Sequence, residues 1–175
     1  MAELFTHVLV GFIIAVVLSW KLAWVTRPMI PVAMVGAAIP DLSRIDLLIP
    51  EEAITAMTGI PWTWGVLHRA GGALLVIAIF TLLVRRDLRR PVVALLTIGV
   101  CSHFVLDYFL WQPTGETNLL LWPFLDIAVD YQGFYRSSDR WPAIVATFVA
   151  GVVLAIDRFV VANTPEDLPR PSSSE

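Results

Sequence analysis

Residues 67–111 read LHRAGGALLVIAIFTLLVRRDLRRPVVALLTIGVCSHFVLDYFLW, and this stretch decides the fold. Its two apolar segments, 67–84 and 91–111, each approach the length of about 20 residues with which a helix spans a bilayer. The basic cluster Arg85–Arg90 separates the two segments, and Pro91 suits the first turn of a helix. The stretch therefore predicts two membrane helices that are joined by a short basic loop.

The rest of the chain continues this pattern. Of its 175 residues, 57% are hydrophobic and 15% are charged, whereas soluble domains carry about 25% charged residues. Further apolar segments cover residues 4–20, 28–40 and 141–161. We predict an all-α, polytopic membrane protein with about five membrane helices, one of them short (28–40), bundled around a polar metal-type site. Residues 1–161 would form a single integral-membrane domain, and 162–175 a disordered polar tail.

The segment 28–40 leaves alternatives open because it is short for a crossing. It is a half-span, a tilted helix, or a helix that ends in the protein interior at Pro40 and Asp41. Residues 41–66 mix charges, prolines and amphipathic stretches, which indicates an interfacial loop with short helices. The net charge of −3 and the lack of an extended basic face argue against nucleic acid as a partner.

Arginines give the orientation. Positively charged loops stay on the cytoplasmic side, so the loop at Arg85–Arg90 is expected there. If 28–40 crosses, Lys21, Arg27 and Arg158 lie on the same side and the N-terminus lies outside. This topology places all three histidines in the outer half of the membrane, together with two aspartates: His7, Asp41, His68, His103 and Asp107. Ionisable residues inside a membrane are costly, which makes this layer a candidate functional site.

Imidazoles and carboxylates together are the ligands of Zn and Mn, while Mg prefers carboxylates. His103 and Asp107 share one helix face, since they are four residues apart. We predict that a divalent metal ion (Zn, Mn or Mg) is held by His7, Asp41, His68, His103 and Asp107, which could bind one ion with an open position or two ions that share a bridging carboxylate. Such an ion would lower the pKa of a bound water to about 7 and make it a nucleophile.

Two further residues would complete a hydrolytic site. Asp46 could ligate the metal or act as a general base, and we assign it the catalytic role of activating water. Arg69, with Arg44, would bind an anionic group such as a phosphate, and Arg69 would steady developing negative charge.

Each polar residue also has a purely structural interpretation. Asp41 could only cap the following helix, His68 and Arg69 could be an interfacial anchor, and His103 with Asp107 could hold two helices together. A transporter or proton relay is a third class, but the chain lacks the two related halves typical of transporters.

The order of several motifs resembles the YdjM-like family of membrane-bound metal-dependent hydrolases. The resemblance runs from about Phe5 to Phe124. It rests on five motifs: Thr6-His7 with Gly11, Gly36 to Asp41 (GAAIPD), His68-Arg69, Ser102 to Asp107 (SHFVLD) and Leu121 to Phe124 (LWPF). It implies a multi-helical inner-membrane protein that hydrolyses its substrate with a bound metal.

The chain departs from the family pattern at two places. Family members often read Pro-Asp-x-Asp-His, whereas Ser43 and Arg44 stand at the last two positions here. They also often carry a second histidine soon after His-Arg-Gly, whereas residues 70–73 read AGGA. These departures favour one metal ion over two.

We therefore predict a multi-pass inner-membrane hydrolase, in contact with the lipid bilayer. Its metal-activated water would attack a phosphoester-type or other ester bond of a lipid-like or phosphorylated substrate near the outer leaflet. The alternative is a non-catalytic accessory or degenerate member whose His and Asp residues make interhelical hydrogen bonds.

Overall fold

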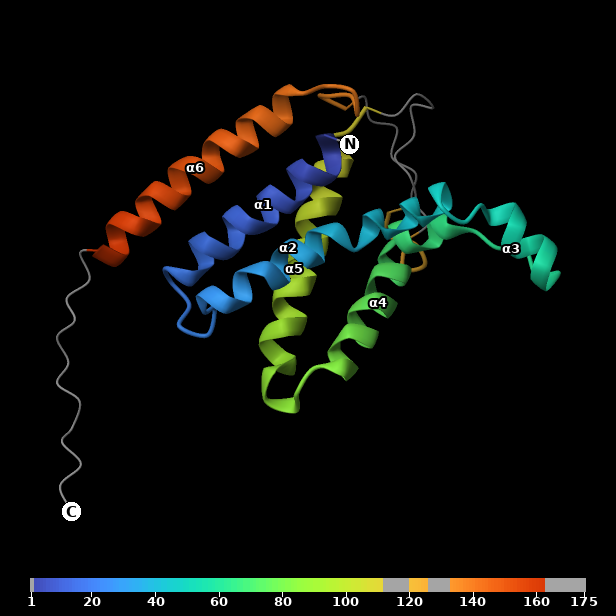
Figure 1. The fold of residues 1–175 in the computed structure, drawn as a ribbon, viewed down its shortest axis with the longest axis horizontal. Helices are drawn as coiled ribbons and strands as arrows, with labels where there is room; N and C mark the ends of the chain where they lie inside the picture. Colours follow the sequence, from blue (N-terminus) through green and yellow to red (C-terminus); the bar gives the residue numbers. More distant parts are fainter. Residues whose placement is uncertain (1, 112–119, 126–132, 163–175) are drawn as a thin grey trace, which may run out of the picture.

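The computed structural model describes residues 2–111, 120–125 and 133–162, and within them the chain is helical with no strand. The elements, in chain order, are α1 (Ala2–Ser19), η1 (Arg27–Met29), α2 (Ile30–Ala38), η2 (Pro40–Leu47), α3 (Glu51–Thr58), η3 (Trp64–His68), α4 (Ala70–Leu83), η4 (Arg86–Leu88), α5 (Arg89–Tyr108) and α6 (Trp141–Ala162). Figure 1 shows their arrangement. The predicted disordered tail lies, beyond Ala162, outside the described residues.

The five predicted apolar segments correspond to α1, α2, α4, α5 and α6. Two helices, Arg86–Tyr108 and Trp141–Phe159, are long and apolar enough to cross a membrane, and Leu4–Ser19 and Ala70–Leu83 are shorter apolar helices. An all-helical architecture with membrane helices is therefore present, while five crossings stay a prediction.

The short segment 28–40 ends inside the protein. Helix α2 has 9 residues, which at about 1.5 Å per residue is less than half the hydrocarbon thickness of a bilayer. Its end is enclosed, since Ile39 is only 1% exposed and Pro40 is also buried. Of the three alternatives, a helix that ends in the protein interior at Pro40 and Asp41 fits this geometry, and a crossing of the membrane by this segment stays a prediction.

Glycines let three helices approach closely. Helix α2 packs against both α1 and α5. A methyl group on Gly99 of α5 would lie 2.3 Å from the carbonyl oxygen of Ala33, and one on Gly36 of α2 would lie 2.4 Å from that of Leu96. A methyl group on Gly11 of α1 would lie 2.9 Å from the Ala33 oxygen. Because no side chain separates these backbones, the start of α1 and the end of α5 meet at the end of α2.

Helices α4 and α5 form an antiparallel pair around the basic turn at η4, as the sequence predicts (Figure 1). Their contact belongs to an apolar core cluster of buried residues: Ile39, Ala73, Ile77, Val92, Leu96 and Val100. Helix α6 packs along α1 and leaves large apolar side chains exposed, for example Phe148 and Phe159, each 72% exposed. An exposed apolar helix face of this kind suits contact with lipid.

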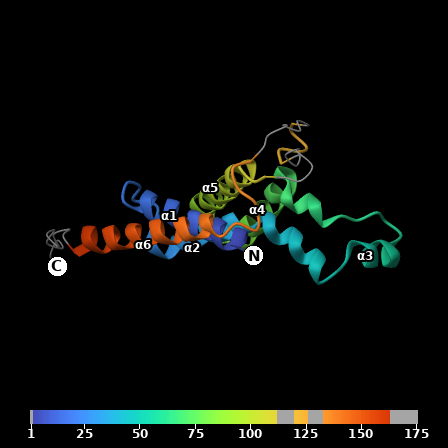
Figure 2. The same cartoon turned by 90° about the horizontal axis from the view of Figure 1, so that it is seen from above.

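An arm, residues 47–63, projects away from the helices between η2 and η3, and both views show α3 at its tip (Figures 1 and 2). It is internally braced: the indole nitrogen of Trp64 donates to the Ile49 carbonyl at 2.9 Å, and the Glu51 carboxylate accepts from the Thr63 hydroxyl at 2.8 Å. Residues 41–66 thus contain short helices, as expected, while their position at the membrane interface stays a prediction.

A polar cluster ties the loop after α1 to the end of α6. Asp157, 5% exposed, accepts a hydrogen bond from the indole nitrogen of Trp20 at 2.9 Å and one from Arg27 at 3.0 Å. The ends that carry Arg27 and Arg158 therefore lie together, as the expected topology requires.

Candidate metal centre

The five predicted metal-ligating residues come together at the end of α2. His7 comes from α1, His103 and Asp107 from α5, His68 from η3 and Asp41 from η2. Two groups have candidate ligand atoms within 4.8 Å of one another, and both contain His103: His7, His103 and Asp107; and Asp41, His68 and His103. Their roles as ligands stay predictions, but four segments distant in sequence do supply one cluster.

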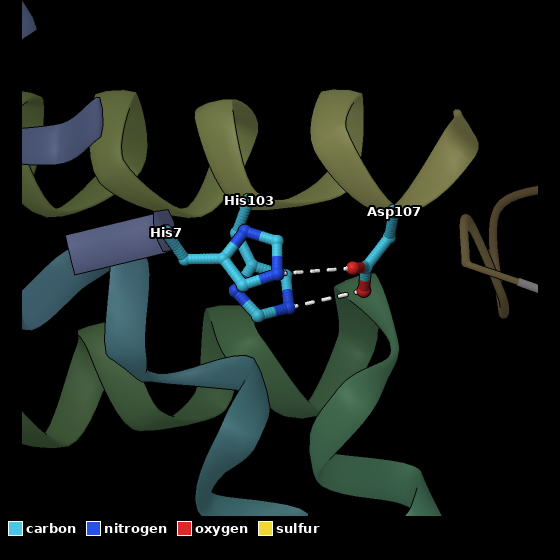
Figure 3. Close-up of side chains that lie close together, drawn as sticks. All are labelled: His7, His103 and Asp107. Atoms are coloured by element: carbon cyan, nitrogen blue, oxygen red, sulfur yellow. Dashed lines mark ion pairs between the residues drawn. The ribbon is translucent and has the colours of Figure 1, made fainter. Parts of the chain in front are cut away.

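The Asp107 carboxylate is the centre of the first group. Its Oδ1 lies 3.2 Å from His7 Nε2, and its Oδ2 lies 2.7 Å from His68 Nε2 and 3.1 Å from His103 Nε2. The rings of His7 and His103 stack with centroids 3.9 Å apart, and Figure 3 shows both pointing toward the carboxylate. A single carboxylate therefore faces three imidazoles.

Backbone carbonyls fix the orientation of two of these rings. His103 Nδ1 lies 2.7 Å from the Ala37 carbonyl oxygen, and His68 Nδ1 lies 3.2 Å from that of Pro40. A carbonyl only accepts, so each Nδ1 carries the proton and donates it. Metal-bound histidines commonly make such a bond with the nitrogen that does not ligate. In the neutral rings, Nε2 is then left with a lone pair directed at Asp107.

The sequence GAAIPD explains why the Ala37 carbonyl is available. The last four carbonyls of a helix have no partner within the helix, and Pro40 has no N–H with which to continue the ladder. The His103 side chain thus completes the end of α2, while His68 binds the Pro40 carbonyl at the start of η2. The close approach at Gly99 brings α5 near enough for His103 to do so.

Three buried side-chain atoms of the cluster have no hydrogen-bond partner within the described part of the chain: His7 Nδ1, Asp41 Oδ2 and His103 Nε2. Buried polar atoms are nearly always satisfied, so orphaned ones need an explanation. All three residues are under 10% exposed. Three imidazoles and two carboxylates with unused lone pairs form a donor set that fits a divalent cation.

Arg44, which stands where family members often have a histidine, contacts the cluster directly. Its Nε donates to Asp41 Oδ1 at 2.7 Å, so Arg44 holds one oxygen of the carboxylate and leaves the other without a partner. Asp41 lies in the first turn of η2, and no side-chain capping bond is found at the start of that helix. The purely capping interpretation of Asp41 therefore has no support in the described contacts.

The two predicted catalytic residues differ in position. Asp46 is exposed, and its Oδ1 accepts the backbone N–H of Glu51 at 3.2 Å; the structure does not bring it into either group. Arg69 directly follows His68 and lines a pocket with it. Both catalytic roles stay predictions.

Sequence reasoning missed two features of the site. One is the use of the Ala37 and Pro40 carbonyls, which only the end of an interior helix at Pro40 could have suggested. The other is Trp122, whose ring lies 5.5 Å from the Arg69 guanidinium. Trp122 belongs to the LWPF motif, but nothing in its spacing from Arg69 predicts the contact.

These features define a class: an all-α membrane protein with a buried cluster of histidines and aspartates suited to a metal ion. The family model described as YdjM inner membrane protein matches residues 1–166. The chain therefore belongs to the YdjM inner membrane protein family, which confirms the resemblance in the sequence and the inner-membrane location. No curated protein and no solved structure matches the chain.

Proposed function

We propose that the protein is a metal-dependent hydrolase of the inner membrane that cleaves a phosphoester-type or other ester bond near the outer leaflet. His7, Asp41, His68, His103 and Asp107 would hold one divalent ion. Family membership, the buried cluster and the three orphaned atoms support this proposal.

One observation carries the proposal. The carbonyls of Ala37 and Pro40 keep the Nδ1 protons of His103 and His68, so each neutral ring directs a lone pair at the Asp107 carboxylate. A proton on Nε2 of one ring makes an ordinary hydrogen bond to the carboxylate, as the 2.7 Å contact of His68 allows. The neutral His103 ring then directs its lone pair at the same oxygen from 3.1 Å, and Asp41 Oδ2 is a further buried oxygen without a hydrogen-bond partner among the described residues. More than one positive charge is therefore needed to satisfy the cluster, which favours a divalent ion.

The donor set favours Zn or Mn, since imidazoles predominate; Mg is the remaining candidate. When bound, such an ion supplies Lewis acidity, which lowers the pKa of water to about 7. The residues around it orient the reaction. The Ala37 and Pro40 carbonyls fix the His103 and His68 rings, and Arg44 fixes the Asp41 carboxylate. Arg69 offers a positive charge to the negative charge that develops on the substrate.

A non-catalytic role has one specific observation in its favour. The contacts of Asp107 with His7 and His68 join α5 to α1 and η3 without any metal. Such contacts between helices are sufficient for a purely structural cluster.

Metal analysis separates the two functions. The purified protein is exposed to Zn, Mn and Mg, dialysed, and measured by mass spectrometry beside His103→Ala and Asp107→Ala. We expect about one ion per chain in the wild type and a near-complete loss in both variants, since each variant removes a side chain that would ligate the ion. Asp157→Ala is the matched control, because it removes a buried aspartate away from the cluster.

Wild-type protein without stoichiometric metal would contradict the proposal. If the metal binds, turnover is measured on soluble and lipid phosphoesters and carboxylic esters. Bound metal without turnover of any of them would favour the non-catalytic alternative.

A further inference from the structure

A pocket adjoins the cluster on the side of η3. It has a volume of about 270 Å³ and is lined by Ser43, Gly65, His68 and Arg69. His68 belongs to both the pocket and the cluster, since its Nε2 lies 2.7 Å from Asp107. A group bound in this pocket would therefore lie directly beside the candidate metal centre.

The pocket contains a positioned positive charge. The Arg69 guanidinium lies over the Trp122 ring at 5.5 Å, and Trp122 is itself fixed because its carbonyl accepts the Gly71 N–H at 3.0 Å. Within the described residues, no carboxylate lies within ion-pair distance of Arg69, in contrast to Arg27 and Arg44. A guanidinium that is held in place but has no anionic partner suits an anionic ligand.

The pocket lies at the root of the arm. Ser43 is on η2, which leads into the arm, and Gly65 is on η3, which follows it; η2 and η3 pack together. The arm exposes large apolar side chains, among them Leu47 at 80%, Leu48 at 85% and Met57 at 86%. The segment from Ile45 to Leu67 contains no lysine or arginine. A polar pocket with one positively charged side chain, Arg69, thus adjoins the apolar surface of the arm. The charged residues of this segment are all acidic.

We propose that this pocket binds the anionic, phosphate-type head group of an amphiphile whose apolar chain lies along the arm. Arg69 and the Ser43 hydroxyl bind the head-group oxygens, because arginine matches phosphate geometry by paired hydrogen bonds. The apolar chain contacts Leu47 and its neighbours, so the ligand arrives from the bilayer. That this ligand is the substrate rests on the proposed hydrolase function; its binding does not.

The test uses dodecylphosphonate, whose carbon–phosphorus bond resists hydrolysis, and inorganic phosphate, which lacks the chain. Calorimetric titrations are made on the full chain in dodecyl maltoside, before and after treatment with EDTA. The detergent is a neutral amphiphile with the same chain, so it lowers the apparent affinity for dodecylphosphonate, and its concentration is kept the same in every titration. We expect saturable binding of dodecylphosphonate at one site in the EDTA-treated protein, and at least about tenfold weaker binding of phosphate.

Matched variants locate the site. Arg69→Gln should weaken dodecylphosphonate binding about tenfold. Arg69→Lys should retain only part of it, because lysine keeps the charge but not the paired hydrogen bonds. Arg136→Gln should leave it unchanged. Arg136 is a fair control because its guanidinium also lies over a tryptophan, Trp111, at 4.9 Å. Unchanged binding in Arg69→Gln, or equal loss in Arg136→Gln, would overturn the proposed pocket.

Leu47→Gln tests the apolar chain against Leu83→Gln, since both leucines are 80% exposed. Only Leu47→Gln should weaken dodecylphosphonate binding, and neither should alter phosphate binding. If phosphate binds as tightly as dodecylphosphonate, the proposal that the ligand is an amphiphile is overturned. Failure of the hydrolase proposal would appear separately, as a wild type without metal or turnover that still binds dodecylphosphonate.

Discussion

Two buried aspartates lie at separate places in the helical bundle, and their surroundings differ in kind. Asp107, 8% exposed, lies near the end of α5, and Asp157, 5% exposed, lies near the end of α6. Both sit in long apolar helices, where an ionised side chain is costly. The difference in how each charge is compensated separates a candidate site from a structural contact.

Asp157 has partners that are permanent donors. Arg27 is always protonated, and the Trp20 indole N–H can only donate. No side-chain atom of this cluster is left buried and unpartnered in the part of the chain that the structure describes. The contact is complete without a ligand and serves to hold α6 against the loop after α1.

Asp107 has partners that can change their state. Each imidazole can donate a proton, lose it or bind a metal, and His7 Nδ1 and Asp41 Oδ2 have no hydrogen-bond partner among the residues that the structure describes. A buried charge that is met by exchangeable groups and leaves donor atoms unused has the properties of a binding site. Burial alone does not distinguish the two aspartates, whereas the chemistry of their partners does.

Asp107→Asn against Asp157→Asn is the sharpest test of this difference. The amide keeps the shape of the carboxylate but removes its charge. Because second-shell substitutions already cost about 10- to 100-fold in metal affinity, the loss of a ligand in Asp107→Asn should exceed about 100-fold. Asp157→Asn should leave the affinity unchanged, as measured by competition with a fluorescent chelator. Equal losses in the two variants would mean that both act only through the fold.

Gly99→Ala tests whether close helix packing positions the site. The added methyl group would lie 2.3 Å from the Ala33 carbonyl oxygen and 2.5 Å from the Ala37 nitrogen, so α2 and α5 must separate. Overpacking of this kind costs about 1–3 kcal/mol, and it should also weaken metal binding because the Ala37 carbonyl orients His103. Thermal unfolding in detergent and metal titration measure the two effects.

Gly151→Ala is the matched control, since nothing lies within 4 Å of a methyl group at that position on α6. Gly151→Ala should leave both the midpoint of thermal unfolding and the metal affinity unchanged. A Gly99→Ala protein that is destabilised but binds metal normally would show that the ring orientations survive helix separation.

Much of this architecture follows from the sequence, because membrane helices are set by apolar length and loop charge. The apolar segments predict the five helices. The basic loop Arg85–Arg90, together with a crossing by residues 28–40, predicts that the five polar residues gather in one layer. The prediction of a metal site followed from the histidines and aspartates, which are rare in membrane helices.

The rest depends on contacts that sequence spacing does not encode. Nothing near His103 indicates that the carbonyl of Ala37 receives its proton, since that contact needs the close packing at Gly99. Asp157 and Arg27 are 130 residues apart, and their pairing requires that α6 return along α1. The exposure of the arm likewise reflects where η2 and η3 meet.

Asp157→Asn should have a smaller effect, which is a loss of stability. The variant keeps the acceptor for Trp20 but loses the charge opposite Arg27. Because the Arg27 side chain is 56% exposed and can be solvated, we expect a cost of about 1 kcal/mol. The unfolding midpoint should fall by about 2–4 °C. Asp87→Asn, which breaks the exposed pair with Arg85, should cause no measurable change, and a fall as large as that of Asp157→Asn would remove the distinction between the two pairs.

Asp46→Asn has the smallest expected effect and decides how far the site extends. General bases contribute about 100- to 10,000-fold to rate, so the predicted role requires a loss of that size in turnover. The carboxylate is exposed, however, and it accepts the Glu51 N–H at the start of α3, a contact that an amide oxygen can keep. We therefore expect turnover to change by less than about threefold, because truncation of an exposed hydrogen bond is a minor perturbation. Glu52→Gln, an exposed carboxylate on the same arm, is the control. A loss above about 100-fold in Asp46→Asn alone would show that the arm moves Asp46 to the cluster during the reaction, and the boundary between arm and site would have to be redrawn.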